Sequence, residues 1–358
     1  MSEDKLNQIK TKYAVVDAKN PDAQQMQIAA DFIKDGKLVA FPTETVYGLG
    51  GNALDPTASE RIYAAKGRPS DNPLIVHIAE FEDLLRVGKN VPREAKLLAD
   101  AFWPGPLTMI VERNEVVPHE TTGGLDTVAV RMPNHQVALE LIRKSGCLIA
   151  APSANTSGRP SPTEGKHVKE DLNGKIAMIL DGGPVGIGIE STIIDLTEEC
   201  PMVLRPGYIT PAMLSKVIGK EVIIDPGIIA ADDTRKPKAP GMKYKHYAPK
   251  GNLMLVEGDL ESVIAEINRR TAEDKVAGKK TIVIATEETK NRYQADEILS
   301  IGEREKEEEI ARHLYGILRE CDTLGAQAIY SESFATPKMG QAIMNRLLKA
   351  AGHEVVQV

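Results

Sequence analysis

The stretch from Phe41 to His77 constrains the fold of this 358-residue chain more than any other. It begins where an apolar run, residues 37 to 41, ends, and such a run predicts a buried strand. Three glycines between residues 48 and 51 follow, and they predict a loop. A second apolar strand is expected over residues 74 to 76. Two strands joined through a helix indicate an α/β unit.

The helix between these strands carries cations at its C-terminal end. Thr57 is its expected N-cap, with Glu60 at the spacing of a capping box. The helix is expected to end near Lys66, and Arg68 follows two residues later. A glycine-rich loop beside two cations suits a polyanion, because backbone N–H groups can approach the anion while the cations neutralise it. A surface turn whose cations suit the helix dipole explains the same residues equally well.

Composition limits the class of protein. A chain of this length is long for one core and suits two domains. The formal net charge of −7 excludes a globally basic nucleic-acid surface, so any polyanion site must be local. Cys147, Cys200 and Cys321 match no metal or disulfide spacing, which predicts buried free thiols in a reducing cytoplasm. We expect no membrane contact, because the sequence shows neither a signal-like segment nor an apolar run of about 18 residues.

The pattern of the chain changes twice. Residues 1–224 mix helical and strand patterns, with strands crowded towards the end, which predicts a mixed α/β domain with an open, partly antiparallel sheet. Residues 225–250 contain four prolines and predict an interdomain linker. The aromatic residues near its end argue against a passive tether. Residues 251–358 alternate strands and helices regularly, which predicts a smaller parallel α/β domain of the Rossmann type.

Two common nucleotide-binding motifs are missing from the sequence. Residues 182 to 192 are rich in glycine and end in Ser-Thr, but no lysine precedes that pair, so a P-loop is excluded. The dinucleotide pattern G-x-G-x-x-G fails as well, because Ser191 stands where its third glycine belongs. Unrelated ATPases and dehydrogenases therefore do not explain the chain.

Polar residues cluster on or just after other predicted strands. Thr127 and Arg131 lie four residues apart on one strand, so both side chains can line one cleft, although Arg131 alone would also fit a surface ion pair. Ser153 and Asn155 follow another strand. Ser161 opens a Ser-Pro-Thr-Glu capping box, and a helix N-terminus of that kind also suits an anion.

Taken in order, these stretches resemble the threonylcarbamoyl-AMP synthases, in the two-domain form of the YrdC-like family. The matching pieces are residues 42–49 (PTETVYGL), 66–68 (KGR), 72–77 (NPLIVH), 127–133 (TVAVRMP), 151–161 (APSANTSGRPS), 181–183 (DGG), 190–195 (ESTIID), 204–207 (LRPG) and the linker around Tyr244. The resemblance covers nearly the full length. It implies a YrdC-like twisted, open mixed sheet in residues 1–224, a linker that closes over the active site in residues 225–250, and a Rossmann-like domain in residues 251–358.

The resemblance also implies a reaction. The enzyme would be a nucleotidyltransferase that joins L-threonine, bicarbonate and ATP into threonylcarbamoyl-AMP, with release of pyrophosphate. The product would pass to the tRNA threonylcarbamoyl-transferase machinery, which modifies position 37 of tRNAs that decode ANN codons; a weak direct contact with tRNA would fit that role. Mg²⁺ is expected with ATP, held by substrate oxygens and water rather than by protein side chains. The expected location is the cytoplasm.

Roles follow residue by residue from the matching motifs. Lys66 and Arg68 would be catalytic, because they would neutralise the departing pyrophosphate. The expected ATP-binding residues are Lys66, Arg68, Asn72, Thr127, Ser153, Asn155, Ser161, Arg205, Tyr244 and Tyr247, and which of the two linker tyrosines contacts ATP stays open. The expected threonine-binding residues are Thr45, His77, Arg131, Ala151 and Ser191. Arg131 would pair with the substrate carboxylate. Without the resemblance, a hydrogen-bonded histidine at a strand end would be the better interpretation of His77.

Two other classes of protein compete with the synthase. An RNA-binding module of translation would need stacking aromatic residues among its basic residues, and the first domain lacks them. A carbamoyl-transfer domain of the hydrogenase-maturation type would resemble residues 1–224. Its acylphosphatase-like and zinc-finger segments have no counterpart in this sequence, and the cysteine spacing excludes the zinc fingers.

Overall fold

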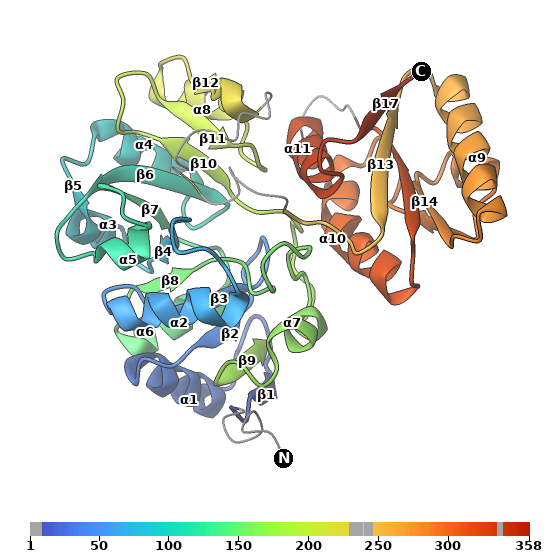
Figure 1. Ribbon diagram of the computed structural model, residues 1–358. Helices are drawn as coiled ribbons and strands as arrows, with labels where there is room; N and C mark the ends of the chain where they lie inside the picture. Colours follow the sequence, from blue (N-terminus) through green and yellow to red (C-terminus); the bar gives the residue numbers. More distant parts are fainter. Residues whose placement is uncertain (1–8, 229–238, 240–245, 335–338) are drawn as a thin grey trace. The chain divides into compact units, whose positions relative to one another are not determined.

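A mixed sheet of twelve strands forms the centre of the first unit in this computed structural model (Figure 1). The structure describes residues 9–228, 239, 246–334 and 339–358. These residues divide into two compact units by their contacts. The second unit contains the described residues from 246 onward together with two short loops, Gly158–Ser161 and Ile187–Ile189.

The first sheet combines parallel and antiparallel pairs. Its strands are β1 (Lys12–Val15), β2 (Val39–Phe41), β3 (Gly48–Asn52), β4 (Ile75–His77), β5 (Gly88–Lys89), β6 (Leu107–Arg113), β7 (Thr127–Arg131), β8 (Ile149–Ala151), β9 (Met178–Asp181), β10 (Thr192–Asp195), β11 (Met202–Arg205) and β12 (Ile223–Ile224). Their order in space is β1-β9-β2-β3-β8-β4-β7-β6-β10-β11-β12, with β5 paired to β6. For example, β7 is parallel to β4 and antiparallel to β6. The predicted partly antiparallel sheet is confirmed.

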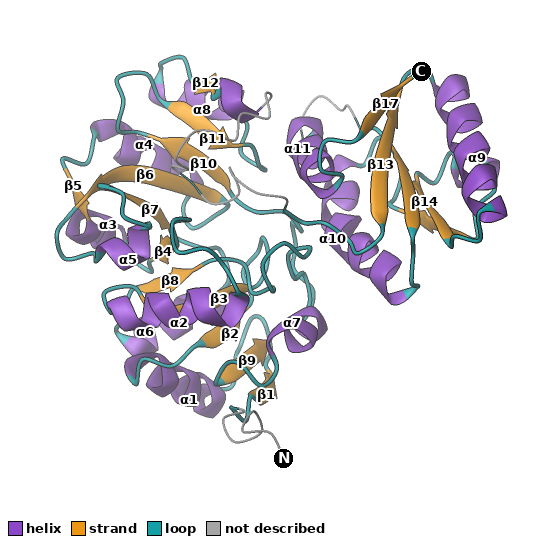
Figure 2. Cartoon of the chain, in the orientation of Figure 1, coloured by secondary structure: helices purple, strands orange, loops and turns teal. Residues whose placement is uncertain are grey.

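Helices cover the two faces of this sheet unequally (Figure 2). The helices of the first unit are α1 (Ala23–Lys34), α2 (Pro56–Lys66), α3 (Phe81–Val87), α4 (Arg93–Phe102), α5 (His119–Thr122), α6 (Gln136–Ser145), α7 (Gly165–Leu172) and α8 (Pro211–Ile218). The larger core lies between one face and helices α2, α3, α4, α7 and α8. On the other face, α1 and α6 pack against β1, β2, β8 and β9.

The rest of that second face carries a small apolar cluster instead of a helix core. Its strand residues are Ile75 of β4, Ala129 of β7, Ile110 of β6, Ile193 of β10 and Leu204 of β11. Ala239, a fully buried residue of the expected linker, packs against the same cluster. This part of the sheet is where the polar residues of the candidate site are found.

Residues 41–77 are called the signature stretch below. Its glycines form strand β3, so the predicted loop over residues 48 to 51 is wrong. Strand β3 pairs with β2 on one side and β8 on the other. A Cβ atom at Gly50 would lie 2.7 Å from Cγ2 of Ile149 and 2.8 Å from the ring of Phe41. Glycine is therefore needed here because neighbouring side chains press close to the backbone of a buried strand.

Both capping predictions in the first unit are also wrong. Helix α2 has Asp55 as its N-cap, whose carboxylate accepts from the backbone N–H of Thr57, and proline occupies its first turn, where the missing N–H is tolerated. Helix α7 begins after Glu164 without a side-chain cap, so Ser161 lies in the loop before the helix and does not cap it. The Pro162 carbonyl instead accepts from the N–H of Tyr47, which holds this segment against the signature stretch.

The second unit is built on a parallel sheet, as predicted, and this sheet has five strands. Its strands and helices are β13 (Asn252–Glu257), α9 (Leu260–Val276), β14 (Thr281–Ala285), β15 (Glu297–Ser300), α10 (Glu307–Thr323), β16 (Ala328–Glu332), α11 (Gly340–Ala350) and β17 (Val355–Gln357). The strand order is β15-β14-β16-β13-β17, and every neighbouring pair of strands is parallel. Helix α9 contacts β13, β14 and β16, and its apolar side chains close a core over that face.

Two expectations from composition can be compared with the described chain. None of its helices is long and apolar enough to span a membrane. The three cysteines are free, and Cys321 is buried. Cys200 is exposed, contrary to the prediction, because it lies in the turn between β10 and β11.

Candidate active site

Strand register brings three predicted site residues, His77, Arg131 and Arg205, into one row across the sheet. His77 of β4 pairs with Arg131 of β7. Because Met109 pairs with Val130 in antiparallel register, Thr108 of β6 lies opposite Arg131. Ile193 of β10 then pairs with Thr108 on one side and with Arg205 of β11 on the other. Paired residues point to the same face, so this row lies on the face that carries the small apolar cluster.

Arg131 is buried and held by three partners. Its Nη1 donates to the Thr45 hydroxyl at 2.9 Å, and its Nε donates to the Gly105 carbonyl at 3.3 Å. Its Nη2 lies 2.7 Å from Oε1 of Glu44. Only 5% of the Arg131 side chain is exposed. A guanidinium fixed in this way presents a planar fork that suits a carboxylate.

His77 stands beside Arg131 as a neutral imidazole. Its Nδ1 lies 3.1 Å from the Ile75 carbonyl, and its ring meets that of Phe41 edge-on at 6.1 Å. Complete burial, and then the positive charge of Arg131, lower the pKa of His77 from 6.5 to about 3. His77 can therefore form hydrogen bonds with a ligand but carries no charge at neutral pH.

Ser191 connects two of the strands in the row. Nη2 of Arg205 donates to the Ser191 hydroxyl at 3.1 Å, and Nε of Arg205 donates to its carbonyl at 3.0 Å. The Thr108 hydroxyl lies 2.7 Å from the same hydroxyl. Arg205 and Ser191 are both buried. One predicted ATP residue and one predicted threonine residue thus share a hydrogen-bond network.

Lys66 reaches the loop that follows β8. Its ammonium donates to the carbonyls of Ser153 and Asn155, and the second of these distances is 2.5 Å. The Ser153 hydroxyl in turn donates to the side-chain oxygen of Asn155. Lys66 is only 2% exposed, so its charge lies within the protein beside two predicted ATP residues. Ala151, the last residue of β8, pairs with Ile75 and lies on the same face as the row.

Arg68 fixes the segment that leads into β4. Its Nη2 donates to the carbonyls of Asn72 at 3.2 Å and Pro73 at 3.1 Å. Thr127 begins β7 and pairs with Glu112. It lies on the same face of that strand as Arg131, as the spacing predicts, at a separation of about 13 Å by strand geometry.

Two of the predicted ATP residues, Ser161 and Tyr247, belong by their contacts to the second unit. Next to Ser161, Nη2 of Arg319 donates to the Pro160 carbonyl at 2.6 Å. Tyr247 stacks on Tyr315, with ring centroids 5.1 Å apart. Tyr244 lies outside the described residues.

Comparison with known proteins identifies the family in which these motifs occur. Two family models match the chain: one described as "Telomere recombination" over residues 31–207, and one described as "Threonylcarbamoyl-AMP synthase, C-terminal domain" over residues 209–352. The threonylcarbamoyl-AMP synthase of Pyrococcus abyssi is 52% identical over 335 residues, which are 93% of this chain and 96% of that protein. The chain belongs to the threonylcarbamoyl-AMP synthase family.

Further relatives agree with this placement in the synthase family. The threonylcarbamoyl-AMP synthase of Bacillus subtilis is 47% identical over 96% of this chain and 97% of its own length. The crystal structure of P. abyssi Sua5 complexed with L-threonine superposes with a TM-score of 0.92 and 50% identity. That superposition covers 97% of this chain and all of the other. The two-domain, YrdC-like interpretation of the sequence is confirmed.

The structure of this synthase-family member also shows residues that the sequence reasoning missed. Glu44 contacts Arg131, and Thr108 contacts Ser191. Glu44 lies inside the signature stretch, so attention to every polar residue there would have found it. Thr108 stands in an ordinary apolar strand sequence, and only the register of β6 reveals its place.

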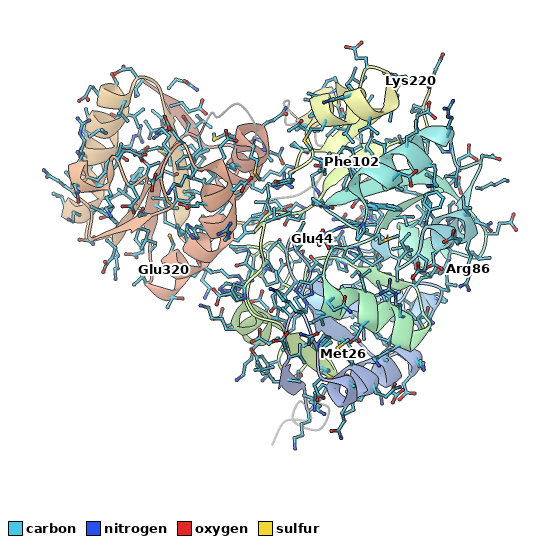
Figure 3. The ribbon with its side chains drawn as sticks, turned by 180° about the vertical axis from the view of Figure 1, so that it is seen from behind. Met26, Glu44, Arg86, Phe102, Lys220 and Glu320 are labelled. Atoms are coloured by element: carbon cyan, nitrogen blue, oxygen red, sulfur yellow. The ribbon has the colours of Figure 1, made fainter. Side chains whose placement is uncertain are left out.

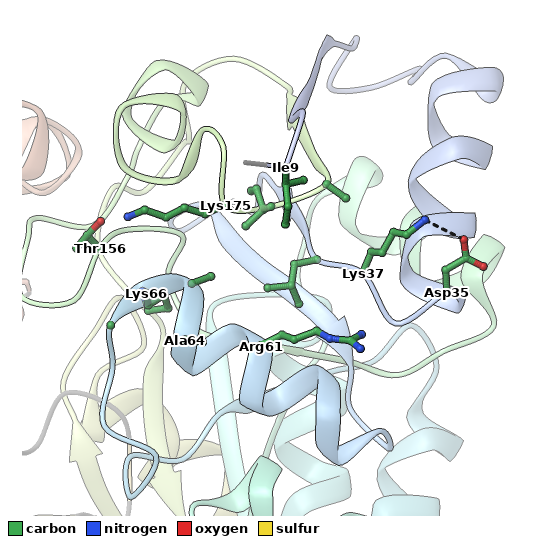
Figure 4. Close-up of a pocket in the computed structure, with 13 residues that line it drawn as sticks. Ile9, Asp35, Lys37, Arg61, Ala64, Lys66, Thr156 and Lys175 are labelled. Atoms are coloured by element: carbon green, nitrogen blue, oxygen red, sulfur yellow. Dashed lines mark hydrogen bonds and ion pairs between the residues drawn. The ribbon is translucent and has the colours of Figure 1, made fainter. Parts of the chain in front are cut away.

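A separate pocket of about 710 Å³ lies between α2 and the chain segments around Lys37 and Lys175 (Figure 4). It is lined by Ile9, Asp35, Lys37, Leu38, Arg61, Ala64, Ala65, Lys66, Gly67, Thr156, Lys175, Ile176 and Ala177. Of the predicted site residues, it shares only Lys66. It contains none of the predicted threonine residues, so it is distinct from the row on the sheet.

The charges of the candidate site suit anionic substrates. Lys66, Arg131 and Arg205 are each at most 6% exposed, and burying a cation is costly unless partners offset its charge. Among the described residues, no group of three or more His, Cys, Asp or Glu side chains could hold a metal ion. The expectation of Mg²⁺ carried by ATP stays a prediction.

Proposed function

We propose that this chain is an L-threonylcarbamoyladenylate synthase, which forms threonylcarbamoyl-AMP and pyrophosphate from L-threonine, bicarbonate and ATP. The observation that carries the proposal is the buried Arg131 between Thr45 and His77 on the open part of the sheet. Family membership over nearly the whole chain supports it, and the related P. abyssi protein has been crystallised with L-threonine.

Threonine binding is assigned to the group around Arg131. The guanidinium would take the substrate carboxylate, while Thr45, neutral His77, Ser191 and the backbone at Ala151 provide hydrogen-bonding groups around it. Ser191 is joined to Arg205, which is assigned to the nucleotide. This shared network would place the threonine next to the reacting phosphate.

Nucleotidyl transfer is assigned to the cations. A carbamate of threonine would attack the α-phosphorus, and pyrophosphate would leave, so catalysis requires positioning and neutralisation of charge rather than a covalent nucleophile. Lys66 and Arg68 are the catalytic candidates. The other residues assigned to ATP are Asn72, Thr127, Ser153, Asn155, Ser161, Arg205, Tyr244 and Tyr247. Mg²⁺ would accompany the triphosphate.

The later steps of the proposed pathway follow from the chemistry of the product. A mixed anhydride of a carbamate and a phosphate is reactive, so a transferase that modifies tRNA would have to accept it directly. Delivery to that machinery, a weak contact with tRNA and a cytoplasmic location stay predictions. The rival RNA-binding function is less well supported, because the buried cations are arranged around hydrogen-bonding side chains rather than along an aromatic surface.

The deciding experiment measures pyrophosphate release and product mass with purified full-length protein. ATP, L-threonine and bicarbonate are supplied together and then omitted one at a time. We expect release only when all three are present, with threonylcarbamoyl-AMP appearing in the same amount as pyrophosphate. Release that does not depend on threonine would overturn the proposal.

A further inference from the structure

Glu44 is the one acidic side chain that an ion pair joins to Arg131 within the described part of the chain. It lies between β2 and β3, in a segment that Thr43 ties together: the Thr43 hydroxyl donates to the Val46 carbonyl at 2.6 Å. This segment directs two consecutive side chains, Glu44 and Thr45, to the same guanidinium. Figure 3 labels Glu44 among the side chains of the first unit.

The carboxylate of Glu44 is mostly buried but incompletely satisfied. Only 13% of its side chain is exposed, and Oε1 lies 2.7 Å from Nη2 of Arg131. Neither carboxylate oxygen has a hydrogen bond of acceptable geometry from any described residue. An ionised carboxylate offers about four lone-pair sites, and a buried one is costly while those sites stay unused. The site therefore retains the capacity to accept a charged donor.

The proposed substrate brings such a donor. L-threonine at neutral pH carries a carboxylate and an α-ammonium on the same carbon, so the two charges enter the site together. Thr45, His77 and Ser191, which are assigned to the substrate's carboxylate and hydroxyl, carry no charge. His77 is neutral because burial lowers its pKa. A positively charged ammonium beside Arg131 needs a negative partner.

We infer that Glu44 binds the α-ammonium of L-threonine and so makes the site specific for an α-amino acid. This inference rests on the proposed function. Arg131 and Glu44, already 2.7 Å apart, form a matched pair of charges that complements the two charges of the substrate. An acid of the same shape without the amino group would meet the arginine but leave the carboxylate unused.

The test is a thermodynamic cycle between the residue and the ligand group. Dissociation constants for L-threonine and for (R)-3-hydroxybutanoate, which keeps the carboxylate and hydroxyl but lacks the ammonium, are measured for the wild type and for Glu44→Gln. We expect the threonine constant to rise about 10- to 100-fold in Glu44→Gln, because a charge-assisted hydrogen bond is lost. The hydroxybutanoate constant and the ATP constant should change less than about 2-fold.

Glu80→Gln is the matched control, since Glu80 is exposed and pairs with Arg143 on the surface. This variant should bind threonine like the wild type. A crystal structure of the wild type with L-threonine adds a direct readout, in which the α-nitrogen is expected within hydrogen-bond distance of a Glu44 oxygen. This readout decides the matter even where hydroxybutanoate binds too weakly to measure.

The possible failures are distinguishable. Equal losses for threonine and hydroxybutanoate would mean that Glu44 only holds Arg131 in place, and they would overturn the inference. Unchanged threonine binding in Glu44→Gln, or an ammonium bound elsewhere in the crystal, would overturn it as well while leaving the proposed function intact. A wild type that binds no threonine would instead refute the proposed function.

Discussion

Backbone carbonyls hold the two candidate catalytic cations, Lys66 and Arg68, in place. Lys66 donates to the carbonyls of Ser153 and Asn155, and Arg68 donates to those of Asn72 and Pro73. A cation held by carbonyl oxygens keeps its full charge, because carbonyls are neutral. An arriving triphosphate would therefore meet cations whose positions are already fixed, which is what electrostatic stabilisation of a transition state requires.

Removal of Arg68 tests the catalytic assignment. In Arg68→Ala we expect kcat for pyrophosphate release to fall about 100- to 1,000-fold, because one preorganised charge at a departing phosphate contributes a few kcal/mol in the transition state. Steady-state kinetics would measure the loss. Arg86→Ala is the control, since Arg86 is an exposed arginine at the end of α3 (Figure 3). Normal turnover in Arg68→Ala would remove Arg68 from the catalytic residues.

The pKa of His77 gives the first unit a pH-dependent stability. Because this pKa is about 3 in the folded protein and 6.5 ordinarily, the unfolded chain takes up a proton below pH 6.5 that the folded protein does not. Stability therefore falls as pH drops from about 6.5 towards 3. The wild type should lose about 1.4 kcal/mol per pH unit relative to His77→Gln between pH 6 and 4.

The chain offers a convenient probe for this measurement. Trp103 is its single tryptophan, and it lies in the first unit, where its indole donates to the Leu107 carbonyl at 2.7 Å. Urea unfolding followed by Trp103 fluorescence at several pH values would therefore report the unit that contains His77. Parallel stability curves for the wild type and His77→Gln would contradict the lowered pKa of His77.

At the scale of elements, close packing of strands and turns places the site. Apolar runs in the sequence indicate β2 and β4 as strands. The glycine-rich residues of β3 show no apolar alternation, so the sequence wrongly predicts a loop there. Gly50 of β3 is needed because neighbouring side chains press close to its backbone, and Gly207, which follows β11, is also closely packed. A Cβ atom at Gly207 would lie 2.5 Å from the backbone nitrogen of Thr192, the residue after Ser191.

Gly207→Ala should therefore displace the backbone at the start of β10 rather than break a single side-chain contact. We expect a loss of about 1–3 kcal/mol in unfolding free energy, because backbone atoms cannot move aside as a flexible side chain can. Threonine binding should weaken as well, through the shift of Ser191. Gly186→Ala is the control, since the nearest atom to its added Cβ would be 3.9 Å away. Urea unfolding and calorimetric titration would measure both effects, and a variant as stable as this control would contradict the packing argument.

The whole molecule consists of two units with separate cores, and all five predicted threonine residues lie in the first. Saturation with threonine alone should therefore stabilise the first unit by about 2.7 kcal/mol at 100 times the dissociation constant. Hydrogen exchange at β4 and β7 should slow, whereas exchange at β14 should not. Equal slowing in both units would show that threonine binding is not confined to the first.

The sequence by itself determined the family, the order of most strands and helices, and the parallel second sheet. Short motifs and apolar periodicity encode these features locally. Only the tertiary structure decided which side chains meet. Thr45 and Arg131 are 86 residues apart, and their contact depends on strand register across the sheet. Glu44, Thr108 and the buried glycine strand escaped prediction because long-range packing, and no local pattern, gives them their roles.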